Sequence, residues 1–164
     1  MYQPTPASHF QYLLTHATPA AIAWIQGNDS QPQLAGSVKF YRTSYGGVLV
    51  EAEIFGLPNI HVQGSGDFYG MHIHEYGNCT RPFDQTGNHY NPDSMPHPQH
   101  AGDLPPLLGN QGYAYKVFYD KRFCVDAILG RSVVIHSMAD DFTSQPSGNS
   151  GDKIGCGVIQ AVTD

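Results

Sequence analysis

Hydrophobic and polar residues alternate along several short stretches of the chain, as in β-strands with one buried face. Over residues 48–54 every second residue is apolar and two of the residues between are glutamates, and residues 37–43 alternate in the same way. Between these stretches, Gly46 and Gly47 can supply the positive φ angles of a tight hairpin. Further strands are predicted at residues 20–26, 71–75, 113–119, 132–136 and 157–162.

Many short strands separated by turn residues indicate an all-β fold, an antiparallel sandwich or barrel. No helical period competes with the alternation over a useful length. Residues 1–18 contain two prolines and show no sustained period, so we expect an extended or loosely attached N-terminal arm there. The rest, residues 19–164, is expected to form one globular domain.

Two long irregular stretches, residues 77–111 and 137–155, interrupt the strands and are dense in Gly, Pro, Asn, Asp and Ser. Loops of this length inside a compact domain are normally either disordered or functional. The first carries three histidines and the second leads to Cys156, which favours a functional role.

The composition argues against some classes of binding partner. The net charge is −6 with only eight Lys and Arg, which argues against binding to nucleic acid or to an anionic membrane. No apolar run reaches the roughly 18 residues that a membrane span needs. The opening residues lack the features of a secretory signal, so a cytoplasmic location is the default expectation.

Cysteine usage leaves two readings open. The three cysteines, Cys79, Cys124 and Cys156, allow at most one disulfide and leave one thiol over. Their spacing alone does not select a pair. The alternative is three reduced thiols in a cytosolic protein.

Histidine is the unusual residue, with nine in the chain and six of them between positions 72 and 136. His72 and His74 lie two apart in a predicted strand, so both side chains project from one face and can hold one ion. A later loop has the pattern H-x7-H-x2-H-x2-D, and the strand at 132–136 ends on a histidine; these residues are His89, His97, His100, Asp103 and His136.

The chemistry of this set suits two metal ions. Imidazole binds copper and zinc alike, and three nitrogens with one carboxylate make the closed tetrahedral set that zinc prefers in structural sites. The other three histidines, His9, His16 and His61, are expected to face solvent without joining the set.

At this point the residues resemble the copper/zinc superoxide dismutases. The resemblance covers roughly residues 20–162 and rests on the order and spacing of segments 70–75 (GMHIHE), 87–92 (GNHYNP), 100–104 (HAGDL), 130–136 (GRSVVIH), 139–141 (ADD) and 156–159 (CGVI). It implies a flattened antiparallel Greek-key sandwich of about eight strands. It also implies the family reaction, in which a redox-cycling copper converts superoxide to O2 and hydrogen peroxide.

The resemblance implies roles for individual residues. The copper ligands would be His72, His74, His89 and His136, and the zinc ligands His89, His97, His100 and Asp103, with the imidazole of His89 shared between the two ions. Asp140 would hydrogen-bond one histidine of each site and so orient both rings. Cys79 and Cys156 would pair, leaving Cys124 free. Family members are often two-fold dimers, which makes a homodimer one option, but no stretch of this sequence identifies a self-complementary patch, so the oligomeric state is left open.

One position departs from the most familiar pattern of the family. Three residues before the last cysteine, where an arginine usually orients the anion, this chain has Lys153. A lysine keeps the positive charge but lacks the rigid two-pronged donor geometry, so attraction should survive better than orientation. We expect a working but slower enzyme. The alternative for Lys153 is an ordinary solvated charge.

Two other functions compete with the enzyme. A copper-binding or copper-delivery module could share the fold without turnover, because fold does not secure function. A structural zinc domain, with the copper positions empty or holding a second zinc, would have no redox chemistry. The full set of four copper ligands favours the dismutase.

Overall fold

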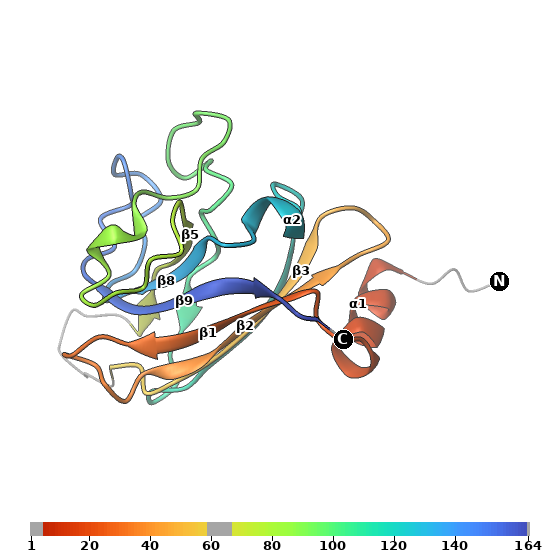
Figure 1. Ribbon diagram of the computed structural model, residues 1–164, viewed down its shortest axis with the longest axis horizontal. Coiled ribbons are helices and arrows are strands. Elements are labelled where there is room, and N and C mark those ends of the chain that lie inside the picture. The colour runs from red at the N-terminus through yellow and green to blue at the C-terminus, as the bar shows by residue number, and fades with distance from the viewer. Residues whose placement is uncertain (1–4, 59–66, 164) are drawn as a thin grey trace.

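The computed structural model describes residues 5–58 and 67–163, so His61 lies outside the described residues (Figure 1). It contains nine strands, namely β1 (Ala21–Gly27), β2 (Ala35–Arg42), β3 (Val48–Phe55), β4 (Phe68–Tyr69), β5 (Met71–His74), β6 (Leu107–Leu108), β7 (Ala114–Asp120), β8 (Ser132–His136) and β9 (Lys153–Ala161). Helices are few in the described residues: α1 (Pro6–His16), α2 (Val125–Ile128) and the 3-10 turn η1 (Asp84–Thr86).

The strands confirm the antiparallel all-β prediction. Seven of them form one curled sheet in the order β5-β8-β9-β1-β2-β3-β7, and β4 pairs with β6 in a second, two-stranded sheet. Each pairing is antiparallel. Neighbours such as β3 and β7 are far apart in sequence, so long connections cross between them, as in a Greek key. The two short strands of the second sheet were not predicted, because two residues carry no detectable period.

The predicted hairpin joins β2 to β3. Gly46 and Gly47 have φ angles of 72° and 71°, in the left-handed region that glycine enters without strain. The alternating residues Val48, Val50, Ala52 and Ile54 of β3 are fully buried, and they pack with residues from β1, β2, β5, β7, β8 and β9 in one continuous core. Alternation along each strand therefore does produce the buried inner face that the sequence predicts.

The N-terminal segment differs from the expectation of an extended arm, because residues Pro6–His16 form helix α1. Its apolar residues Phe10, Leu13 and Leu14 lie on one helix face and are half-buried, but a stripe of three residues is too short to show a sustained period in the sequence. A proline in its first turn favours the start of a helix, and Phe10 packs against Tyr119 with ring centroids 4.9 Å apart. The contact holds α1 to the end of the sheet.

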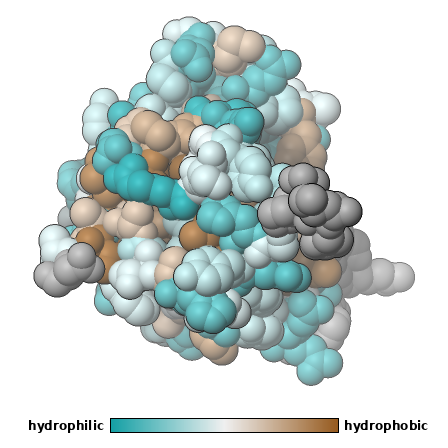
Figure 2. Space-filling view, turned by 90° about the vertical axis from the view of Figure 1, so that its right-hand side faces the viewer, coloured by the Kyte–Doolittle hydropathy of each residue, from teal (hydrophilic) through white to brown (hydrophobic). Residues whose placement is uncertain are grey.

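Figure 2 views the end of the molecule where α1 lies, and hydrophobic residues there occur in small areas separated by hydrophilic ones. His16 is exposed, as expected, whereas His9 is half-buried beside the ring of Tyr45. Of the helices in residues 5–58 and 67–163, none has the length and apolar character that crossing a membrane requires.

Candidate metal centre

Strands β5 and β8 carry different side chains on their two faces. Their pairing aligns His72 with Val134 and His74 with Ser132, and residues that face each other across an antiparallel pair project to the same side. The alternate residues, Met71, Ile73, Val133 and Ile135, belong to the core. The histidines therefore project from the outer face of a sheet whose inner face is firmly anchored.

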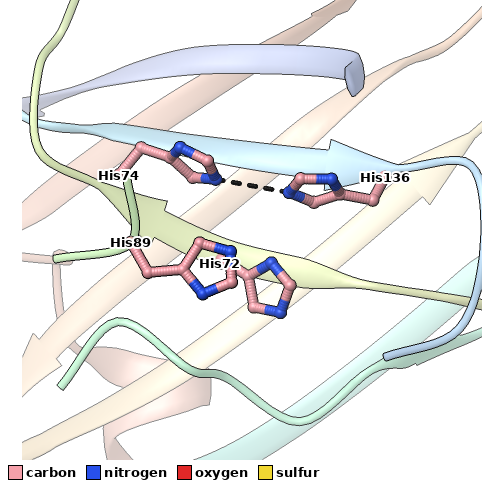
Figure 3. A group of neighbouring side chains, drawn as sticks. All are labelled: His72, His74, His89 and His136. Atoms are coloured by element: carbon pink, nitrogen blue, oxygen red, sulfur yellow. Dashed lines mark hydrogen bonds between the residues drawn. The ribbon is translucent and has the colours of Figure 1, made fainter. Parts of the chain in front are cut away.

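Four imidazoles meet on this outer face, and we call them the strand group: His72, His74, His89 and His136. Their ligand atoms all lie within 4.8 Å of one another (Figure 3). The Nε2 atoms of His74 and His136 are 3.3 Å apart. None of these four histidines is more than 4% exposed. The group is therefore enclosed by protein on most sides.

Hydrogen bonds decide which ring nitrogen of each histidine faces the centre of the strand group. Nδ1 of His74 donates to the carbonyl of Gly87 at 2.9 Å, which leaves Nε2 with its lone pair toward His136. Nδ1 of His136 lies 3.4 Å from the carbonyl of Gly151 and turns its Nε2 inward in the same way. These partners fix the tautomers that a metal ion would need.

Burial keeps these rings neutral. It lowers the pKa of His72 to about 4, although Asp140 opposes the shift, and it holds the pKa of His74 and His136 well below 6.5. At neutral pH the three imidazoles therefore carry free lone pairs, the form in which histidine binds metals.

A second set, which we call the loop group, consists of His89, His97, His100 and Asp103, again with ligand atoms within 4.8 Å of one another. The loop that carries it docks alongside β5 through backbone bonds. Tyr90 donates to the carbonyl of Ile73, and Ile73 donates to the carbonyl of Gly102. Isolated bridges pair His74 with His89 and His72 with Asp103. Short pieces of the loop thus pair with β5 as an additional strand would.

Within the loop group the histidines surround the carboxylate of Asp103. Nδ1 of His89 lies 2.7 Å from Oδ1, and Nδ1 of His100 lies 3.2 Å from the same oxygen. Nδ1 of His97 lies 3.1 Å from Oδ2. Burial tends to raise the pKa of Asp103, but the hydrogen bond and charge of His89 and its neighbours outweigh burial and lower it. Asp103 is therefore an anion.

Asp140 connects the two groups. Its Oδ2 accepts from Nε2 of His72 at 2.7 Å, and its Oδ1 accepts from Nε2 of His97 at 2.8 Å. Burial would raise the pKa of this carboxyl, but hydrogen bonds from His72, the Phe142 amide and His97 hold it well below its usual range. Each ring must then present Nδ1 to its own group, because its proton sits on Nε2.

The two groups fit a pair of metal ions. Three buried nitrogens, His72 Nδ1, His89 Nε2 and His97 Nδ1, have no hydrogen-bond partner among the described residues. Such groups cost free energy unless something else satisfies them. Nδ1 of His97, which carries only a lone pair, also lies 3.1 Å from a carboxylate oxygen. A metal ion bound between these two atoms would satisfy both of them.

Three residues that support the loop group were not recognised as functional from the sequence alone. Arg122 donates to the carbonyls of His100 at 3.0 Å and Asp103 at 2.6 Å while pairing with Asp120. The side-chain amide of Gln145 bonds both the N–H and the carbonyl of His97. A Cβ on Gly148, whose φ is +70°, would meet Asp140 Oδ1 at 2.0 Å. These contacts join segments distant in sequence and follow no spacing pattern.

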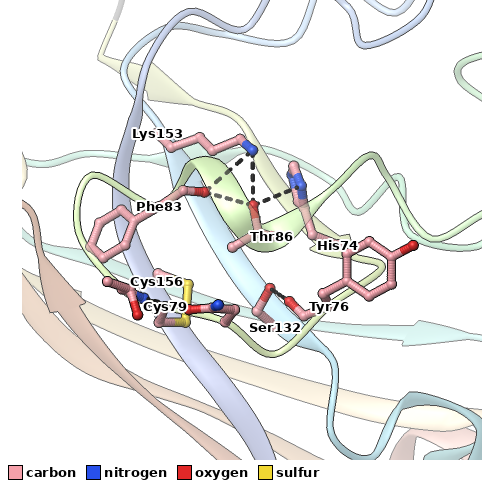
Figure 4. Close-up of a disulfide and its surroundings, with 10 residues drawn as sticks. His74, Tyr76, Cys79, Phe83, Thr86, Ser132, Lys153 and Cys156 are labelled. Carbon is pink, nitrogen blue, oxygen red and sulfur yellow. Dashed lines mark hydrogen bonds between the residues drawn. A yellow bond between two sulfur atoms is a disulfide. The ribbon is translucent and has the colours of Figure 1, made fainter.

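The disulfide that the resemblance implied is present, between Cys79 and Cys156. It closes 77 residues of sequence and lies beside Phe83 and Val134 in a small second apolar cluster (Figure 4). It ties the start of the first long loop to β9. Cys124 is an exposed free thiol.

Lys153 is not in the second long loop, as the sequence suggested, but opens β9. A bulge between Ile135 and His136 shifts the pairing, so that Lys153 instead of Ile154 lies opposite His136. Ile154 joins the core, and Lys153 faces the histidine side. Bulges often redirect a side chain in this way beside functional sites.

A cleft of about 490 Å³ opens over the strand group, and its lining includes His74, His89, His136 and Lys153. His100 also lines it, whereas His97 and Asp103 do not. One side of the pair of groups is therefore open to a small molecule, and the loop group lies mostly behind it.

Comparison with known proteins agrees with this geometry. A sequence model of the family described as copper/zinc superoxide dismutase (SODC) matches residues 34–159. Superoxide dismutase (Cu-Zn) 3 of Arabidopsis thaliana is 34% identical over 155 residues, which cover 85% of this chain and 88% of the relative. The solved structure of the clock protein EA4 has a TM-score of 0.74 at 28% identity and covers 88% of this chain and 96% of that one.

Two relatives from Mus musculus differ in what their names describe. The extracellular superoxide dismutase (Cu-Zn) is 35% identical over 138 residues, 79% of this chain, and the copper chaperone for superoxide dismutase is 36% identical over 154 residues, 85% of this chain. The chain spans about half the length of each, 54% and 52%. With its fold, its two histidine groups with donor sets suited to copper and zinc, and these matches, the chain belongs to the copper/zinc superoxide dismutase family.

Proposed function

We propose that this chain is a superoxide dismutase that converts superoxide to O2 and hydrogen peroxide. The strand group would hold copper through His72 Nδ1 and the Nε2 atoms of His74, His89 and His136. The loop group would hold zinc through the Nδ1 atoms of His89, His97 and His100 and through Asp103. Copper would supply one-electron redox chemistry, and zinc, which has none, would supply structure.

The observation that carries this proposal is the position of His89 in both groups. Its Nδ1 lies 2.7 Å from Asp103, and its Nε2 is buried toward the strand group with no partner among the described residues. The ring of His89 therefore directs one nitrogen at each group, which links the proposed copper site to the proposed zinc site. His89 Nε2 is then the atom at which a proton can be held and delivered to reduced oxygen.

The surrounding residues divide the remaining tasks. Asp140 holds the rings of His72 and His97 in the required tautomers, and Asp103 with the other loop-group residues keeps the His89 ring in place. Lys153 stands at the wall of the cleft, where its charge would attract an anion to a molecule whose net charge is −6. The cleft of about 490 Å³ has ample room for a diatomic anion.

Similarity to the copper chaperone favours a second candidate, a copper-delivery module without turnover. A delivery protein must release its ion to a partner, and accessible, movable ligands serve that purpose. The strand group has the opposite properties, because its four residues are at most 4% exposed and three of their rings are held by backbone or carboxylate oxygens. These features favour retention of copper and hence the enzyme.

Metal analysis combined with a superoxide assay tests the proposal. The purified protein is assayed for copper, zinc and superoxide consumption before and after copper loading. We expect one copper and one zinc per chain, with turnover that depends on copper. Tight copper binding without turnover would favour delivery, and zinc alone with no gain on loading would favour a structural zinc domain.

A two-fold homodimer and a domain that begins at residue 19 remain predictions. Analytical ultracentrifugation of the metal-loaded protein tests the first, and folding of a chain that begins at residue 19 tests the second. Neither is required for the chemistry proposed above, because all seven proposed ligands come from one chain.

A further inference from the structure

Lys153 lines two hollows on the surface of the molecule. One is the cleft over the strand group. The other is a neighbouring hollow of about 420 Å³, lined in part by Asp84, Asp152 and Lys153 itself. A lysine side chain has four rotatable bonds and a compact charge, so it can turn toward either hollow unless something restrains it.

The direction that Lys153 takes decides what its charge can do. Asp84 and Asp152 are exposed carboxylates, and a lysine turned toward them would form an ordinary surface ion pair. Its field would then be partly cancelled for an anion that enters the cleft. Burial lowers the pKa of Lys153, and the charge of Asp84 opposes that shift.

The shortest hydrogen bond of the Lys153 ammonium is with the side chain of Thr86, and Figure 4 shows the two residues side by side. Nζ donates to Oγ1 of Thr86 at 2.8 Å, while the carbonyls of Phe83 and Gly87 are 3.5 Å and 3.4 Å away. Thr86 is fully buried. A hydrogen bond between a charged donor and a buried acceptor is among the stronger kinds in proteins.

Thr86 is itself held in one orientation. Its hydroxyl donates to the carbonyl of Phe83 at 2.9 Å, so a lone pair of Oγ1 faces Lys153. Its backbone is fixed as well, because its amide donates to Phe83 and its carbonyl accepts from Tyr76. The acceptor that meets Lys153 is therefore preorganised.

We infer that Thr86 is a positioning residue that holds the Lys153 ammonium on the cleft side, where it attracts and orients a small anion. The hydroxyl thereby supplies part of the fixed geometry that a lysine lacks relative to an arginine. The inference rests on the proposed function for the identity of the anion, superoxide.

An effect through the neighbouring histidine is the competing explanation. Thr86 Oγ1 lies 3.4 Å from Nδ1 of His74, but that nitrogen has a shorter bond, 2.9 Å, to the carbonyl of Gly87. His74 therefore keeps its orientation when the hydroxyl is removed. The two explanations differ in whether the effect of a Thr86 variant depends on Lys153.

A double-mutant cycle on the copper- and zinc-loaded protein separates them. The probe is azide, a small anion that binds copper, and its dissociation constant is measured by absorption titration for wild type, Thr86→Val, Lys153→Met and the double variant. We expect Thr86→Val to weaken azide binding about 3- to 10-fold, as for the loss of one hydrogen bond. In the Lys153→Met background the same change should have no further effect.

Conservative and matched variants sharpen the result. Thr86→Ser keeps the acceptor and should restore most of the affinity. A Lys153→Arg background offers more N–H donors for the two carbonyls, so Thr86→Val should matter less than with lysine. Thr80→Val, an exposed threonine of the same loop, is the matched control and should leave binding unchanged. If Thr86→Val does not fold, Thr86→Ala is measured in the same cycle.

A crystal structure of metal-free Thr86→Val provides a readout without metals, and Lys153 should turn toward Asp84 in it. Equal weakening of azide binding in the Lys153→Met background, a fall in copper content, or an unmoved Lys153 would overturn the inference. Failure of the proposed function is distinguishable, because wild-type protein would then bind azide in a Lys153-dependent way but consume no superoxide.

Discussion

The strand group and the loop group obtain their geometry from different parts of the fold. In the strand group three histidines stand on β5 and β8, whose inner faces are anchored in the core. In the loop group all four residues lie within residues 89–103 and depend on Asp140, Arg122 and Gln145 to hold them. A metal ion in the first would meet a rigid site, whereas one in the second would also stabilise the loop.

The difference also separates chemistry from structure. All of the strand group except His72 lines the cleft, whereas the loop group lines it only through His89 and His100. His89 is the exception that belongs to both. The proposed division of labour, redox chemistry on the rigid, open side and stability on the enclosed side, follows from this arrangement.

Removal of His89 should give the largest effect because it takes a ligand from both groups. For His89→Ala we expect copper and zinc affinity each to fall at least about 100-fold, beyond the range typical of an outer hydrogen-bond partner. Competition with a chromophoric chelator measures both. His16→Ala, on exposed α1, is the matched control. Loss of only one metal would show that the ring is not shared.

Acid should act mainly through the strand group of the metal-free protein. Three of its histidines, His72, His74 and His136, have pKa values below the ordinary 6.5, about 4 for His72. As the pH falls, these histidines take up protons in the unfolded chain before they do so in the folded protein. The free energy of unfolding is therefore greatest above pH 6.5 and declines toward pH 4. We expect a loss of up to about 1.4 kcal/mol per pH unit for each such histidine. Urea unfolding between pH 7.5 and 4.5 measures it, and a flat profile would contradict the buried, neutral rings.

Asp140→Asn should weaken both groups because an amide offers one acceptor oxygen where two rings need one each. We expect copper and zinc affinity to fall about 10- to 100-fold. Asp93→Asn, at an exposed carboxylate of the first long loop, should change neither affinity. An effect confined to one metal would mean that Asp140 orients only one ring.

Arg122→Met should separate the two groups. Arg122 donates hydrogen bonds to the carbonyls of His100 and Asp103. Among the described residues, none of its hydrogen bonds is to β5 or β8. We expect zinc affinity to fall about 10-fold with copper affinity nearly unchanged. Arg42→Met removes an exposed pair with Asp126 and should change the free energy of unfolding by less than about 1 kcal/mol. Equal losses for both metals would contradict independent support of the loop.

The smallest effect is expected at α1, which lies outside the residues matched by the family. Phe10→Ala removes the contact with Tyr119 and should lower the free energy of unfolding by about 1 kcal/mol while both metal affinities stay unchanged. Tyr12→Ala, whose side chain is largely exposed, should have less effect on stability. A change in metal binding would instead connect α1 to the centre.

Much of the fold was predictable because alternation along a strand is a local property. The pattern at residues 48–54 and the two glycines after residue 45 were sufficient for β3 and its hairpin. The helix at Pro6–His16 was missed because its apolar stripe of Phe10, Leu13 and Leu14 is too short to show a sustained period. The start of β9 was missed because glycine and lysine at 153–157 obscure the alternation. Short strands such as β4 and β6 arise from tertiary pairing alone.

For the site, the sequence by itself determined that His72 and His74 share one face, because neighbours two apart in a strand must do so. It also supplied the ligand types and the motifs by which the family is recognised. Only the tertiary structure decided that Asp140 bonds one ring of each group, that Arg122 and Gln145 hold the loop, and that a bulge turns Lys153 toward the histidines and Thr86. These are contacts between segments far apart along the chain, and their geometry depends on how the sheet curls and pairs, which no local pattern of residues encodes.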